Sequence, residues 1–195
     1  MPKISEARRE ARRGEILDAA LRCFTRSGYQ KTSMADIIAE SGLSAGAIYL
    51  YFSSKADLVR AVAARVLDTR RIEIEAAGAD GPVSPAAIVR IIAEGVRAGA
   101  PLPVLVQVWG EATTDDALRE RMQETVGHMR STIRDALERW ARAQPEREAT
   151  AGEWADLVAP VVVGMLPGFI LQCALVDGFD QEKYLRGLDG LLPTG

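Results

Sequence analysis

The stretch that decides the fold is residues 40–58, which read ESGLSAGAIYLYFSSKADL. It opens with a short polar segment around Gly42, which can take the left-handed conformation that other residues avoid. Leu43 is expected to enter the core from this turn, and Ser44 is a strong N-cap for the helix that follows. Two helices joined at a steep angle by so short a turn form a helix-turn-helix pattern.

The residues before this turn predict the first two helices. One helix is expected over residues 6–27, ended by Gly28 in the left-handed conformation. Ser33 and Asp36 then form a capping-box pattern, which opens a second, short helix that ends before the turn.

Capping signals predict further helices to the end of the chain, and no stretch shows the sustained two-residue alternation of a strand. The expected starts are Ser54 with Asp57, Ser84 before Pro85, the segment between Pro101 and Pro103, Thr113 or Thr114, Thr150 with Glu153, and Asp180. The sequence therefore predicts an all-α fold of about nine helices.

The clearest break in the helical pattern is Ala79-Asp80-Gly81-Pro82, which is a turn sequence. We expect an N-terminal helix-turn-helix domain of residues 1–54 and a C-terminal domain of residues 55–195. A helix over residues 55–79 would connect the two domains.

Charge is divided unevenly along the chain, although the formal net charge is only −3. Residues 1–71 hold 13 Lys and Arg against 8 Asp and Glu, whereas the remainder holds 11 against 19. A basic first third beside an acidic remainder is typical of a small nucleic-acid-binding domain joined to a domain that binds no nucleic acid.

Several classes of protein are disfavoured by what the sequence lacks. Cys23 and Cys173 have no metal-ligand partner at the right spacing, which predicts reduced core thiols and no metal site. There is no nucleophile elbow, and the Gly42-x-x-x-Gly46 pair lacks the lysine of a P-loop, so we expect neither an enzyme nor a cofactor. The first residues carry no apolar core of a signal peptide, which favours a cytoplasmic protein.

The run from Gly42 to Leu58 strongly resembles the DNA-binding domain of the TetR family of bacterial repressors. In that family a Tyr-x-Tyr/His-Phe core closes the domain and a lysine opens the next helix, as residues 49–52 and Lys55 do here. Gly28-Tyr29 and residues 32–39 fit the same pattern. The resemblance covers approximately residues 10–65.

The resemblance implies which residues would meet DNA. They are Thr32, Ser33, Ser44, Ala45, Gly46, Ala47, Tyr49, Tyr51 and Lys55. The hydroxyls and the lysine ammonium would bind phosphates, and the small residues that open the recognition helix would reach base edges. Two alternatives stay open: one tyrosine could pack in the core, and Thr32 or Ser33 could be only a helix cap.

Two features leave the target DNA sequence undefined. Ala45 stands where family members often carry Lys or Arg, and Ala45 and Ala47 can offer bases only methyl contacts. The four arginines between residues 8 and 13 could compensate, with the N-terminal arm entering a minor groove, or could simply be the solvated start of a helix.

In the family the C-terminal domain dimerises and holds a small inducer. The expected ligand-binding residues are Val106, Trp109, Met122, Val126, Met129, Met165 and Phe169, and the expected dimer-interface residues are Leu157, Val161, Gly164, Gly168 and Leu188. For any single ligand candidate, ordinary core is the alternative that the pattern favours. His128, the single histidine, is expected to be structural or exposed rather than a ligand.

Residues 157–176 form an apolar run that is long enough to cross a membrane. Two prolines, two glycines and acidic flanks disfavour a span, because a lone span carries Lys or Arg on its cytoplasmic side. An obligate interface with a second copy explains the run better.

The sequence thus predicts a cytoplasmic, homodimeric transcriptional regulator that binds a pseudo-palindromic double-stranded operator. It would act as a repressor that a small apolar or amphipathic ligand releases from DNA, without a membrane partner. The alternative is a DNA-binding protein that responds to no ligand, but its large apolar C-terminal domain would then have no use.

Overall fold

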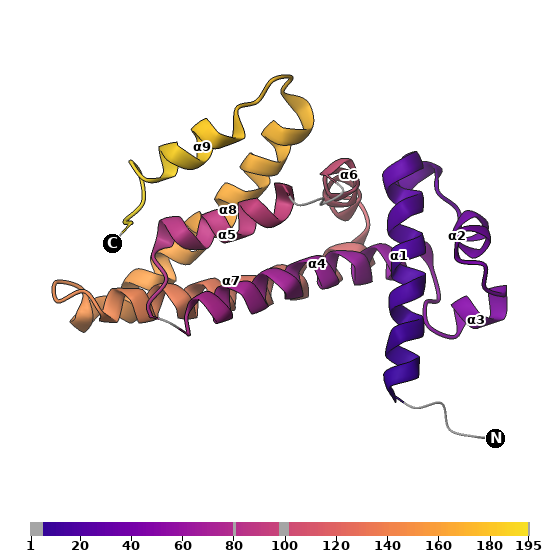
Figure 1. The fold of residues 1–195 in the computed structure, drawn as a ribbon, viewed down its shortest axis with the longest axis horizontal. Coiled ribbons are helices and arrows are strands. Elements are labelled where there is room, and N and C mark those ends of the chain that lie inside the picture. Colours follow the sequence, from indigo (N-terminus) through magenta and orange to yellow (C-terminus); the bar gives the residue numbers. More distant parts are fainter. Residues whose placement is uncertain (1–5, 80, 98–101, 195) are drawn as a thin grey trace. The chain divides into compact units, whose positions relative to one another are not determined.

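The computed structural model describes residues 6–79, 81–97 and 102–194, without the side chains of residues 66 and 67. Every regular element among them is a helix (Figure 1), which confirms the all-α class. The helices are α1 (Glu6–Lys31), α2 (Met34–Ser41), α3 (Ala45–Tyr49), α4 (Lys55–Ala77), α5 (Pro85–Arg97), α6 (Leu102–Ala112), α7 (Asp116–Arg142), the short 3-10 helix η1 (Glu148–Thr150), α8 (Ala151–Leu175) and α9 (Gln181–Leu188).

The chain divides into two compact units. We call the residues up to Arg65, together with Pro103–Met122, the head, and we call Val66–Leu102 with Gln123–Gly195 the body. The helices α4, α6 and α7 therefore each contribute residues to both units. The predicted boundary between residues 54 and 55 separates two functional domains and not two compact units, and it stays a prediction.

Apolar residues at helical spacing build the core of the head. Phe24 of α1, Ile37 of α2 and Ile48 of α3 are fully buried in one cluster. Val104 and Val108 of α6 belong to the same cluster, since they lie one turn apart on that helix. The apolar cluster of the head therefore includes residues of α6 as well as of the first three helices.

Local hydrogen bonds form the helix-turn-helix as the sequence predicts. Ser33 Oγ accepts from Asp36 N at 3.1 Å and Asp36 Oδ2 accepts from Ser33 N at 2.8 Å, which completes the capping box of α2. Gly42 ends α2 with φ 66° and ψ 11°, the left-handed conformation. Ser44 Oγ then accepts from Ala47 N at 3.3 Å and caps α3.

The first helix differs from its predicted form. The break falls at Gly28 as predicted, with φ 77°, but ψ is 163°, which is extended and not left-handed helical. Because the chain then returns to helical geometry, one further turn follows and α1 reaches Lys31.

Three of the predicted later starts are confirmed by hydrogen bonds. Ser54 accepts from Asp57 N at 3.1 Å, Ser84 accepts from Ala87 N at 3.3 Å, and Asp180 accepts from Lys183 N at 2.8 Å. The predicted start of α6 falls partly on Pro101, which lies outside the described residues.

Two predicted starts are wrong. α7 is capped by Asp115, whose carboxylate accepts from Leu118 N at 2.9 Å, while the hydroxyls of Thr113 and Thr114 donate back to carbonyls of α6. α8 has no side-chain cap at Thr150, because the 3-10 turn η1 leads directly into it.

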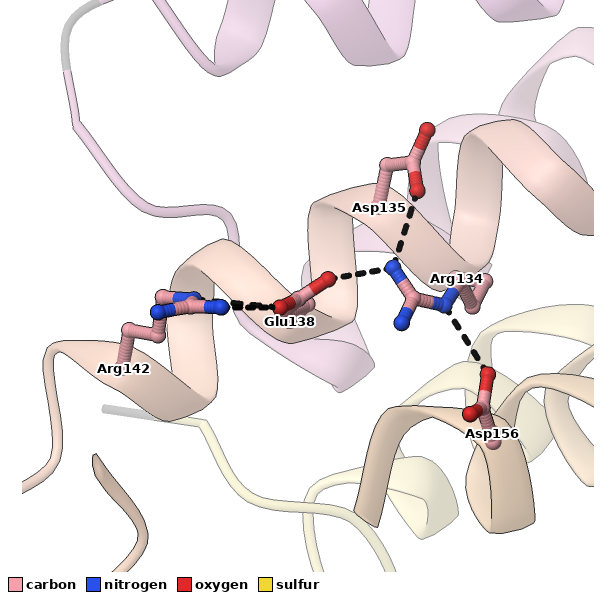
Figure 2. Close-up of polar contacts among 5 residues, drawn as sticks. All are labelled: Arg134, Asp135, Glu138, Arg142 and Asp156. Carbon is pink, nitrogen blue, oxygen red and sulfur yellow. Dashed lines mark hydrogen bonds and ion pairs between the residues drawn. The ribbon is translucent and has the colours of Figure 1, made fainter. Parts of the chain in front are cut away.

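Charged side chains join α7 to α8 in the body (Figure 2). Arg134 Nε donates to Asp156 Oδ1 at 2.9 Å, and the same guanidinium pairs with Asp135 and Glu138. Glu138 also accepts from Arg142. Asp156 above all raises the pKa of Arg134, and the hydrogen bond from Arg142 lowers the pKa of Glu138. The network ties the start of α8 to α7.

Candidate DNA-binding and dimerisation sites

The recognition helix α3 presents small residues to solvent. Ser44, Ala45 and Gly46 are exposed and Ala47 is half-buried, while Ile48 anchors the helix in the core of the head. A side chain at Gly46 would meet nothing within 4 Å. The start of α3 is therefore open enough for close approach to another surface, as a helix that enters a major groove requires.

The two tyrosines after α3 divide between the alternatives that the sequence left open. Tyr49 is 51% exposed, so its hydroxyl is accessible to a phosphate. Tyr51 is partly buried and packs against the apolar cluster of the head. Tyr49 is thus the better candidate for a DNA contact.

Thr32 does not offer its hydroxyl for the predicted phosphate contact. It is only 2% exposed, and its hydroxyl donates to the carbonyls of Gly28 at 2.7 Å and Cys23 at 3.3 Å. A buried hydroxyl that already has internal acceptors is not offered to a phosphate, and this correction leaves Ser33, which is exposed, as the candidate at this end of α2.

Lys55 has an internal role that the sequence did not predict. Its Nζ donates to the carbonyls of Tyr29 at 2.9 Å and Gln30 at 3.3 Å, and it lies 4.4 Å from the centre of the Tyr29 ring. A lysine that binds the last carbonyls of a helix complements the negative end of the helix dipole. Lys55 therefore joins the start of α4 to the end of α1, and a direct phosphate contact stays a prediction.

The arginines at the start of α1 are partly engaged within the head. Arg12 pairs with Glu15 at 2.7 Å, and Arg13 pairs with Glu10 at 3.5 Å and lies over the Phe52 ring. The predicted arm that would enter a minor groove falls on residues 1–5, outside the described part of the chain.

α8 carries an apolar stripe that is mostly exposed. Leu157 is 74% exposed and Val161 is 56% exposed, and Gly164 and Gly168 follow on the same face. Leu171 and Leu175 extend the stripe, although they were not among the predicted interface residues. Spacings of four and three residues repeat along this face, which is the period of a helix that packs along another helix.

One predicted interface residue is wrong. Leu188 of α9 is only 3% exposed, because it is buried within its own chain. The alternation of apolar residues in α9 shows that one face is buried, but the sequence does not tell which helix covers it.

The apolar stripe also bears on the membrane question. Residues Glu148–Leu175 are long and apolar enough to cross a membrane by length and composition, and 28% of the most apolar window is buried in the described chain. Pro160 and Pro167 lie within the helix. Most of this apolar window is therefore not buried within the described part of a single copy.

The predicted ligand-binding residues divide between the two units. Val106, Trp109 and Met122 lie in the head, where each is half-buried. In the body, Met165 is half-buried and Val126 is exposed, whereas Met129 and Phe169 are buried.

Phe169 is ordinary core, which is the alternative that the sequence left open. It is 1% exposed, and its ring centre lies 5.9 Å from Phe179 and 5.1 Å from Tyr184. This aromatic cluster joins α8 to α9. Phe169 is therefore no longer a strong candidate for a ligand contact.

Comparison with known proteins agrees with this geometry. Residues 16–62 match the family model described as bacterial regulatory proteins, tetR family, and residues 86–193 match the one described as BetI-type transcriptional repressor, C-terminal. The chain is 30% identical to an uncharacterized HTH-type transcriptional regulator of Mycobacterium tuberculosis, over the full length of both chains.

Two solved structures are similar in fold. FadR from Bacillus subtilis, in complex with stearoyl-CoA, has a TM-score of 0.74 at 16% identity over 92% of this chain and 96% of that chain. A putative transcriptional regulator from Saccharomonospora viridis, in complex with choline, has a TM-score of 0.67 at 22% identity over 94% of this chain and 95% of that chain.

The helix-turn-helix and these matches define a class, the DNA-binding transcriptional regulators, whose members are not enzymes. Within that class the chain belongs to the TetR family.

Proposed function

We propose that the protein is a cytoplasmic homodimeric repressor that leaves its operator when a small apolar or amphipathic molecule binds. The exposed stripe on α8 carries the proposal, since it supplies the surface by which two recognition helices would be joined. The match of residues 86–193 to a transcriptional repressor model supports repression rather than activation.

The head supports a docking scheme in which α3 enters the major groove. Ser44 and the backbone around Gly46 would approach base edges, and the methyl groups of Ala45 and Ala47 would contact thymine. Tyr49 and Ser33 would bind phosphates on either side of the groove. Because few side chains in α3 can hydrogen-bond to bases, shape and deformability of the operator would contribute much of the specificity.

The stripe on α8 supports a two-fold interface. Gly164 and Gly168 are one turn apart and have nothing within 4 Å of an added Cβ, so two copies of the helix could approach closely there. Leu157 and Leu175 would be buried towards the two ends of the contact. Two-fold symmetry would make the operator a pseudo-palindrome.

The two similar structures hold stearoyl-CoA and choline, which differ in size and charge, so they do not favour one chemical class for this chain. Half-buried Trp109, Met122 and Met165 are the remaining candidates of adaptable, apolar character.

The experiment selects duplexes from a random DNA pool with the full-length protein and then measures expression from the selected sequence in cells with and without the protein. We expect inverted half-sites and lower expression when the protein is present. Direct repeats would contradict the two-fold model, and higher expression would show an activator.

Release from DNA is tested on the same selected duplex. Choline and stearoyl-CoA are the first probes, followed by a chemically varied panel of small molecules, and bound DNA is measured by fluorescence anisotropy. A compound that releases the selected duplex and leaves the fold intact supports induction. Retention throughout the panel favours the alternative, a regulator that responds to no ligand.

A further inference from the structure

The end of α1 is bound by a side chain from a helix far along the sequence. Where α1 breaks at Gly28, the next backbone N–H, that of Tyr29, donates to Gln107 Oε1 of α6 at 2.7 Å. One turn further along α6, Glu111 accepts from Gln30 Nε2. Two polar side chains of α6 thus hold two consecutive residues of α1, all within the head.

The break in α1 fits Gln107 closely. A Cβ at Gly28 would lie 3.2 Å from both terminal atoms of the Gln107 amide, and the φ of 77° would strain any other residue there. Gly28 therefore gives the Gln107 amide room to reach the backbone of Tyr29.

Two further elements bind the same short segment. Lys55, the first residue of α4, donates to the carbonyls of Tyr29 and Gln30, and Thr32, just before α2, donates to the carbonyl of Gly28 at 2.7 Å. The segment of residues 28–30 is thus fixed by α6 and α4 and by the residue that leads into the helix-turn-helix.

We propose that Gln107 is a positioning residue, through which α6 fixes the end of α1 and so sets the orientation of α2 and the recognition helix α3 for DNA. The inference rests on the proposed function for its biological meaning. A displacement of α6 must either move the end of α1 or lose the Gln107 bond.

The exposure of Gln107 distinguishes a positioning role from a contribution to core packing. α6 is already anchored in the core of the head by Val104 and Val108. Gln107 is itself exposed, so it adds little buried area. Its main contribution is the hydrogen bond that orients the end of α1 on α6. Tyr29 is buried, hence loss of an acceptor for its N–H is unfavourable.

The test compares three variants of the full-length protein. Gln107→Met keeps the length of the side chain and removes the acceptor, whereas Gln107→Glu keeps an oxygen in place to accept from Tyr29 N. Gly110→Ala is the control on the same helix, because its added Cβ meets nothing within 4 Å. Each variant is measured for operator affinity, for thermal stability and for hydrogen exchange of the Tyr29 amide.

We expect Gln107→Met to speed exchange at Tyr29 and to weaken operator binding by about five- to tenfold, the effect of one hydrogen bond. Gln107→Glu should restore both, and Gly110→Ala should change neither. Thermal stability should fall by about 2–4 °C in Gln107→Met, because the Tyr29 N–H loses its acceptor while the apolar anchor of α6 is untouched.

Three results would overturn the proposal. They are an unchanged operator affinity in Gln107→Met, a loss that Gln107→Glu does not restore, and a loss that Gly110→Ala shares. Failure of the proposed function gives a different result. The wild-type protein would then select no operator from the DNA pool. Hydrogen exchange at Tyr29 would still show whether the Gln107 bond forms.

Discussion

A capping-box pattern stands before α2 in the head and before α8 in the body, but its capping hydrogen bonds form only at α2. Ser33 and Asp36 form a full capping box, with φ −103° and ψ 165° at Ser33. Thr150 and Glu153 stand at the same spacing before α8, but Thr150 has φ −117° and ψ 12° and its side chain makes no capping bond.

The backbone explains the difference. A capping side chain reaches the N–H three residues on only when the chain enters the helix from an extended conformation. At Thr150 the chain is already wound into the 3-10 turn η1, so the hydroxyl has the wrong direction. The start of α2 is thus set by bonds between near neighbours, whereas the start of α8 is set by the turn that precedes it.

The largest expected effect is on the body. Val161→Asp places a charge within the stripe on α8, and we expect a dimer that is about a hundredfold weaker or more, since a buried unpaired carboxylate is costly. The subunit itself should stay folded, because Val161 is 56% exposed within one copy. Sedimentation velocity at micromolar concentration measures the change.

A matched control uses a residue of the head. Leu50→Asp changes a leucine that is 74% exposed, as Leu157 is, but that lies after the recognition helix. The Leu50→Asp variant should remain a dimer. A dimer in Val161→Asp as well would show that the stripe is not the interface.

Two glycines of the head provide the second prediction. Gly42→Ala should lower the free energy of unfolding by about 1–2 kcal/mol, because Gly42 has the left-handed φ of 66°. Gly46→Ala should be neutral or stabilising by about 0.5 kcal/mol, because Gly46 lies within α3. An added Cβ meets nothing within 4 Å at either site, so only the backbone differs. Urea unfolding of both variants measures this difference, and equal losses would contradict it.

The third prediction tests the capping comparison directly. Ser33→Ala should destabilise the head by about 1 kcal/mol, because it removes the bond to Asp36 N. Thr150→Ala should change stability by only a few tenths of a kcal/mol, since no cap bond is lost there. Chemical denaturation provides the measurement, and a similar loss in both would mean that Thr150 caps α8 in solution.

These differences explain how far the sequence could predict the molecule. The caps at Ser33 and Ser44 and the turn at Gly42 were predictable because each is decided by residues within three positions of it. The stripe on α8 was also readable, and its period of four and three residues could have added Leu171 and Leu175 to the predicted interface.

The sequence failed where distant partners decide. Thr32 looked like a phosphate ligand, but its hydroxyl donates to the Gly28 carbonyl, and the sequence did not predict that Lys55 donates to the Tyr29 carbonyl. The bond between Gln107 and Tyr29 joins residues 78 positions apart, and nothing in a lone glutamine predicts it. The same limit made Leu188 look like an interface residue and Phe169 like a ligand contact.

The smallest expected effect is on stability at low pH, and it compares a glutamate of the head with one of the body. In the head, Glu40 of α2 accepts from Arg22 at 2.7 Å and from Arg26 at 3.0 Å, both on α1. In the body, Glu138 accepts from Arg142 and Arg134, which lie on its own helix. Hydrogen bonds from Arg22 and then Arg26 lower the pKa of Glu40 from its ordinary 4.5, so the folded state favours the carboxylate.

Glu40→Gln should therefore lower the melting temperature of the head slightly at about pH 7 and have less effect at about pH 3. A lowered pKa contributes stability above the ordinary pKa, and that contribution disappears as acid protonates the folded carboxyl. Glu138→Gln should follow the same course with a weaker effect on the contact between helices, because its two arginines lie on α7 itself. Melting curves of both variants and the wild type across this pH range provide the measurement. A difference between Glu40→Gln and the wild type that stays constant down to about pH 3 would mean that the Glu40 carboxylate contributes no linked stability.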